Sequence, residues 1–178
     1  MCSSAYIENS TDRKKRKCAN YTMSALIWSC IKGHSDVVLK LAGEADVDVN
    51  WQDCNGDTAA IWAVRNNRVE CVRILSNLGN IDWNLQNRWG NTAAIEAVKW
   101  NSLGSLETLI HVPGIRWNMK NNENESCLNI AIKDDSLQAF TMISSMPNVD
   151  WSITDREGDT LDNIARYIIL FNYPKQIF

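Results

Sequence analysis

The chain has 178 residues, of which 45% are hydrophobic and 22% are charged, and its formal net charge is −3. This composition supports a packed core in one elongated domain. No apolar run approaches the roughly 18 residues that a membrane-spanning helix needs, so we expect no membrane span.

Residues 1–20 differ in kind from the rest of the chain, because they show no periodic pattern. They contain a run of five cations: Arg13, Lys14, Lys15, Arg16 and Lys17. With Glu8 and Asp12 the segment carries +3, which leaves −6 on the remaining residues. We predict a disordered basic arm on an acidic body. Such a run is typical of a nuclear import signal or a nucleic-acid arm, and a solvated tail that aids solubility is an equal alternative.

From Ser24 onward the chain repeats itself. A hydroxyl residue opens a helical pattern every 34 residues, at Ser24, Thr58, Thr92, Ser126 and Thr160. A second marker, Trp83, Trp117 and Trp151, has the same spacing. A fixed period of this length indicates one supersecondary unit whose core is completed by its neighbours. We predict repeats at about 24–57, 58–91, 92–125 and 126–159, and a half-repeat cap at 160–178.

Each unit begins with turn chemistry. The pattern Asx-x-x-Gly-x recurs before the hydroxyl residue, and Asn124 replaces its glycine in the fourth copy. The Asx side chain bonds nearby backbone and the glycine takes a positive φ, which asparagine tolerates next best. The hydroxyl residue is then a good helix N-cap.

Two helices follow each turn. The first is rich in alanine, which lets adjacent helices approach closely, and the second carries one apolar stripe. The predicted helix pairs are 24–32 with 35–42, 58–66 with 69–77, 92–100 with 103–111, and 126–133 with 137–145, and a last helix spans 160–171.

Residues for catalysis or metal binding form no convincing pattern. The six cysteines include no Cys-x-x-Cys pair, and the two histidines are scattered. Cys30, Cys71 and Cys127 lie in helical stretches and are interpreted as small buried hydrophobes. Asp57 and Asp159 recur at the repeat period, which weakens an acid/base interpretation. We predict no catalytic residue, no cofactor and no metal ligand.

The repeat resembles the ankyrin repeat family. The first half of the family pattern is matched by Asp53, Gly56, Thr58 and Ala63, and the second half by residues 33–41. The family's loop asparagine is matched by Asn50, Asn84 and Asn118. The resemblance covers about residues 23–178. This chain departs from it with Ala59 and Ala93 in place of proline, with Ile27, Ile61 and Ile95 in place of histidine, and with one extra residue per repeat. It implies an all-α helix-turn-helix solenoid with β-turn fingers over 21–178.

The same resemblance implies a non-enzymatic module that binds a partner protein through its concave face and finger tips. The alternative is a structural or inhibitory segment that docks onto another part of a larger chain. Nucleic-acid binding by the acidic repeats is disfavoured, since phosphate would be repelled, and we expect a monomer. A polar beginning without an apolar signal stretch, and reduced thiols, predict a location in the cytoplasm or nucleus.

Tryptophan is unusually frequent, with eight residues. Trp83, Trp117 and Trp151 are interpreted as a ladder between loops, and Trp28 and Trp62 as partly buried core. Trp89 at a finger tip and Trp100 at a helix end are repeat-specific, and such aromatics are enriched in binding hot spots. The alternative is exposed aromatics without a role. The predicted partner-binding residues are Arg65, Arg88, Trp89, Asn91, Lys99, Trp100, Asn122 and Glu123.

Overall fold

The computed structural model describes residues 25–146, 149–151 and 160. Residues 25–32 are helical. They are followed by α2 (Ser35–Ala42), α3 (Ala59–Arg65), α4 (Val69–Ser76), α5 (Ala93–Lys99), α6 (Leu103–Leu109), α7 (Cys127–Lys133) and α8 (Leu137–Ser144). These bounds lie within two residues of the predicted ones. The predictions for the basic arm with Arg13–Lys17, for the last helix and for nearly all of the cap concern residues outside the described part.

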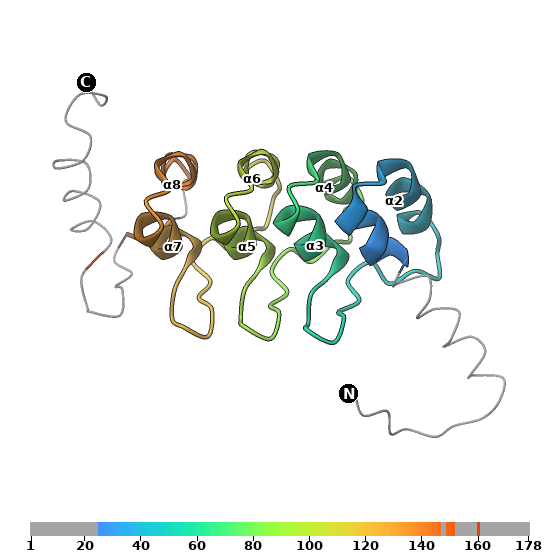
Figure 1. Cartoon of the computed structure of the whole chain (residues 1–178), viewed down its shortest axis with the longest axis horizontal. Coiled ribbons are helices and arrows are strands. Elements are labelled where there is room, and N and C mark those ends of the chain that lie inside the picture. The colour runs from blue at the N-terminus through green and yellow to red at the C-terminus, as the bar shows by residue number, and fades with distance from the viewer. Residues whose placement is uncertain (1–24, 147–148, 152–159, 161–178) are drawn as a thin grey trace, which may run out of the picture.

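The helices form two rows, which Figure 1 shows nearly end-on. The inner row contains α3, α5 and α7, the outer row contains α2, α4, α6 and α8, and neighbours pack within each row and across each repeat. Finger loops project beyond the inner row (Figure 1). Residues 25–146 contain no β-strand, so the predicted all-α solenoid is confirmed. Within the described part of the chain, every helix is too short or too polar to span a bilayer.

The hydroxyl residues act as N-caps, as predicted. Thr58 Oγ1 accepts from the Ile61 amide at 3.1 Å, and Thr92 and Ser126 make the equivalent bonds. The turn glycines Gly56 and Gly90 have φ of 76°, and Asn124 has 63° at the same position. A Cβ on Gly90 would lie 2.6 Å from the Asn122 nitrogen, so glycine is also needed for the close approach of the next finger.

Amide side chains join the fingers to one another. Gln52 Nε2 donates to the Gln86 carbonyl at 2.9 Å, and Gln86 Nε2 donates to the Lys120 carbonyl at 2.9 Å. Asn50 and Asn84 each bridge two backbone groups of the following repeat. The fingers are therefore cross-linked by hydrogen bonds at the repeat period, which makes their tips a continuous and stiff edge.

The apolar core runs along the solenoid between the two helix rows. Leu75 and Leu109, at equivalent positions of α4 and α6, are completely buried, and so are the three helical cysteines. Burial raises the pKa of Cys127 to about 12, which keeps this thiol neutral. Of the predicted ladder, Trp83 and Trp117 are buried in the core, at 6% and 8% exposed, and Trp151 is half-buried against it.

Candidate functional site

An ion-pair network lies where the second repeat meets the third. Arg65, in the last turn of α3, donates from Nη2 and Nη1 to the two carboxylate oxygens of Asp57 at 2.8 and 3.0 Å. Its Nε donates to Glu96 Oε2 on α5 at 2.9 Å. The Asp57 and Glu96 side chains are 0% and 2% exposed, and Arg65 is 13% exposed. Arg65 therefore joins the finger that precedes its own helix to the inner helix of the next repeat.

Glu96 is the centre of this network. Its Oε1 accepts from Asn87 Nδ2 at 3.1 Å and Asn91 Nδ2 at 2.8 Å, and its Oε2 accepts from Trp100 Nε1 at 2.8 Å. Burial alone would raise the pKa of Glu96, but the hydrogen bonds from Arg65 and Asn91, the Arg65 charge and the Asn87 bond lower it below its ordinary value. Glu96 is thus held as an anion.

Asp57 and Glu96 in turn stabilise the charged form of the Arg65 guanidinium. Burial disfavours the charged form of Arg65, yet the hydrogen bonds to Glu96 and Asp57 raise its pKa above the ordinary value. Asp57, weighed above as an acid/base residue, is occupied by Arg65 and by Asn87 Nδ2 at 2.8 Å. Its role here is structural.

Trp100 is attached to this buried network but remains accessible. It forms the C-cap of α5 and is 57% exposed, while its indole N–H is bonded to Glu96. A hydrogen bond to an anchored carboxylate restricts the indole to one orientation, so less conformational entropy is lost when a partner covers it. Trp100 therefore combines exposure with order.

Trp89 is also exposed and ordered. It is 40% exposed at the finger tip, and the Arg88 guanidinium carbon lies 4.1 Å from its ring centroid. The backbone on both sides is bonded to neighbouring fingers, since the Arg88 amide donates to the Asn55 carbonyl at 2.8 Å and the Asn122 amide donates to the Trp89 carbonyl at 3.0 Å.

Two of the predicted contact residues require correction. Asn91 is only 1% exposed, because its amide donates to the buried Glu96. Arg65 is held between Asp57 and Glu96. Both residues stabilise the scaffold beneath the surface and do not present free side chains to a partner.

The prediction for Trp28 is wrong. This residue is interpreted from the sequence as partly buried core, but its side chain is 59% exposed. Trp62 is half-buried, and its indole donates to Asp53.

The remaining predicted residues are at the surface. Arg88, Lys99, Asn122 and Glu123 are exposed. Asn122 also donates from Nδ2 to the Arg88 carbonyl at 2.9 Å, so it links two fingers. Lys99 occupies the position of Arg65 one repeat later. Within the described residues no carboxylate lies within ion-pair distance of Lys99, because Asn91 replaces the aspartate of the preceding repeat.

The sequence interpretation missed Glu96. It occupies the position of Trp28 and Trp62 in the repeat register, so a charge stands where the two preceding copies have an aromatic ring. That substitution was the available signal. Its partners could not be found from spacing, since Arg65 reaches it across 31 residues.

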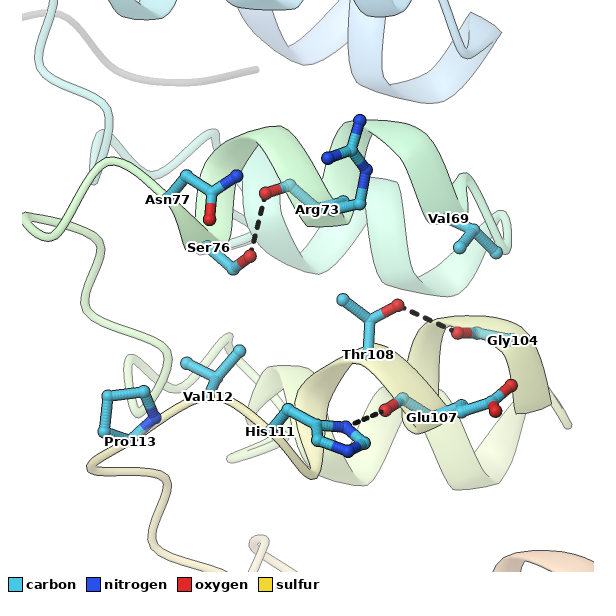
Figure 2. Close-up of a pocket in the computed structure, with 10 residues that line it drawn as sticks. All are labelled: Val69, Arg73, Ser76, Asn77, Gly104, Glu107, Thr108, His111, Val112 and Pro113. Atoms are coloured by element: carbon cyan, nitrogen blue, oxygen red, sulfur yellow. Dashed lines mark hydrogen bonds between the residues drawn. The ribbon is translucent and has the colours of Figure 1, made fainter.

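A groove on the outer side offers no comparable arrangement. It lies between α4 and α6 and has a volume of about 710 Å³ (Figure 2). Three of its polar side chains bond their own helix backbone: Thr108 to the Gly104 carbonyl, Ser76 to the Arg73 carbonyl and His111 to the Glu107 carbonyl. A ligand site needs a few polar groups that converge on the cavity, and each of these three side chains is already bonded to the backbone through a polar atom.

The fold and the network together define a class of protein. It is a solenoid of two-helix repeats whose finger tips and inner-helix ends carry ordered, accessible side chains. A family model described as ankyrin repeats (3 copies) matches residues 4–87 and 26–121. The chain belongs to the ankyrin repeat family. This family generally mediates protein–protein interactions and is typically non-enzymatic. A search of curated proteins found no match.

Proposed function

We propose that this protein binds a partner protein through the inner helix of the third repeat and the finger that precedes it, with Trp100 and Trp89 as the main contacts. The observation that supports this most is the ordered exposure of both indoles. An exposed tryptophan on a stiff scaffold offers a large apolar area and loses little entropy on binding. No chemistry is needed from the module.

The positive charges next to the two indoles favour a partner with acidic groups. Arg88 and Lys99 are exposed and, within residues 25–146, neither lies within ion-pair distance of a carboxylate. A partner with acidic groups opposite them would associate faster, and the association rate would fall as salt is added. The finger tip next in the row contributes Asn122 and Glu123 at the edge of this surface.

The proposal is tested by affinity capture from a cell lysate with the wild-type protein and the double variant Trp89→Ala/Trp100→Ala. We expect a saturable partner that the double variant no longer retains. Leu39→Ala is the matched control, because Leu39 is 58% exposed but lies on outer helix α2. The proposal fails if the double variant captures the same proteins as wild type in the same amounts, or if Leu39→Ala is equally impaired.

A further inference from the structure

Aromatic rings continue from the third repeat across the inner helices of the first and second, where Trp28 is exposed and Trp62 is half-buried. Trp28 and Trp62 occupy the same register position, which α5 fills with Glu96. Trp100 lies four residues after Glu96, and residues at this spacing share one helix face. The aromatic stripe, defined here as Trp28, Trp62 and Trp100, therefore places one indole on the same side of three successive inner helices.

Two of the three indole N–H groups of the stripe are already used within the protein. Trp62 Nε1 donates to Asp53 Oδ2 at 3.0 Å and Trp100 Nε1 donates to Glu96 Oε2 at 2.8 Å. A ligand on Trp62 and Trp100 consequently meets ring faces and edges, without a free indole donor. Such a surface selects apolar side chains over hydrogen-bond acceptors.

Basic side chains of the protein lie close to the rings of the stripe. Lys32 Nζ lies 5.8 Å from the Trp28 centroid, and the Arg65 guanidinium carbon lies 4.6 Å from the Trp62 centroid. Lys99 is the residue next to Trp100. Arg65 is neutralised by its two carboxylates, but Lys32 and Lys99 have no carboxylate within ion-pair distance among the described residues. At the Trp28 and Trp100 ends of the stripe, a ligand cation would be repelled and a ligand carboxylate attracted.

The residues at the end of the inner helix become acidic in the fourth repeat. Asp134, in the fourth repeat, occupies the position of Trp100 and is exposed, as is Asp135 beside it. An acidic segment would therefore be favoured over the first three repeats and disfavoured over the fourth. The attractive surface coincides with the aromatic stripe.

The spacing of the stripe suggests the conformation of the ligand. Packed helices are about 8–10 Å apart, and α3 packs directly on α5. A polyproline II segment advances about 3.1 Å per residue with three residues per turn, so every third side chain points the same way about 9 Å further on. Trp28 and Trp62 would meet residues three apart in such a segment, which then runs obliquely to reach Trp100, about one helical turn further along its helix.

Resting on the proposed function, we propose that the stripe binds an extended acidic segment of the partner with a bulky apolar residue at every third position. The segment crosses the inner helices from the first repeat to the third. Its apolar residues pack on Trp28, Trp62 and Trp100, and its carboxylates face Lys32 and Lys99.

The test uses the full chain and three synthetic peptides. The first contains three copies of leucine-glutamate-proline, the second has lysine in place of glutamate, and the third has the composition of the first with its leucines at alternate positions. Calorimetry and the indole N–H resonances report binding. We expect the first peptide to bind at least about tenfold more tightly than either control and to shift the Trp28 and Trp100 resonances. Equal or tighter binding of the lysine peptide or of the rearranged peptide overturns the proposal.

Two variants separate this inference from the proposed function. Trp28→Ala should weaken the first peptide about tenfold, whereas Leu39→Ala, with an exposed side chain of nearly equal accessibility, should leave it unchanged. Unchanged peptide affinity in Trp28→Ala contradicts the stripe. If the peptides do not bind but lysate capture still depends on Trp89 and Trp100, the inference fails and the proposed function stands.

Discussion

The second and third repeats place a basic residue at the same position near the end of the inner helix, with opposite results. Arg65 is enclosed by Asp57 and Glu96 and joins two repeats. Lys99 is exposed, since Asn91 replaces the aspartate and Ile130 stands where the next helix would supply a glutamate. One position is therefore structural in one copy and available for recognition in the next. Identity of position within a repeat does not imply identity of role.

The largest expected effect comes from Arg65→Ala. Removing the guanidinium leaves two buried carboxylates without their cation, and breaking a buried pair typically costs about 3–5 kcal/mol. Lys99→Ala is the matched change one repeat later and should alter the free energy of unfolding by about 0.5 kcal/mol or less. Urea denaturation measures both. Similar losses in the two variants would remove the distinction between the repeats.

The apolar core should contribute similarly to the free energy of unfolding in the second and third repeats. Leu75→Ala and Leu109→Ala each empty a completely buried site at the same register position, and each should cost about 2–5 kcal/mol. Urea denaturation measures both losses. A negligible loss in either variant would contradict the shared core stripe.

The pH dependence of stability isolates Glu96. Burial alone would raise its pKa, but Arg65, Asn91 and Asn87 lower it below 4.5 in the folded state. The stabilisation is therefore present above about pH 4.5 and is lost as pH falls through the folded value. Glu96→Gln should be less stable than wild type at pH 7, and the difference should narrow below about pH 4 in chemical denaturation. A constant difference between pH 7 and pH 3 would be the contrary result.

The smallest effect on stability is expected for the basic run at 13–17, outside both repeats. Replacing its five cations by serine should leave unfolding unchanged. If the run is an import signal, a fluorescent fusion moves from the nucleus to the cytoplasm on this replacement. Equal distribution of both fusions would favour the solvated tail.

Features set by the repeat period were predictable from sequence. Thr58 and Thr92 cap their helices because the preceding turn and the following apolar pattern are local. Trp83 and Trp117 are buried because the packing at this position recurs from one repeat to the next. These features require no knowledge of a specific distant partner.

The network could not be predicted in the same way. Arg65 and Asn91 are predicted at the binding surface because they lie at a helix end and in a finger, where the family binds partners, yet both side chains are bonded to the buried Glu96. Trp28 was assigned to the core from the apolar character of its helix, although it is exposed. A hydrogen bond or ion pair between repeats depends on the residues that both copies place at the contact. The sequence of one copy alone does not reveal such a pair.

The central claim is that Trp100 serves recognition while the buried network serves the fold. It is tested most directly by measuring partner affinity and unfolding free energy on the same Trp100→Ala protein. We predict about a 30-fold loss of affinity, corresponding to about 2 kcal/mol. The free energy of unfolding should fall by only about 1 kcal/mol, because water can replace the exposed indole as the donor to Glu96. Unchanged affinity, or a loss of folding stability as large as the loss of binding, would contradict the account.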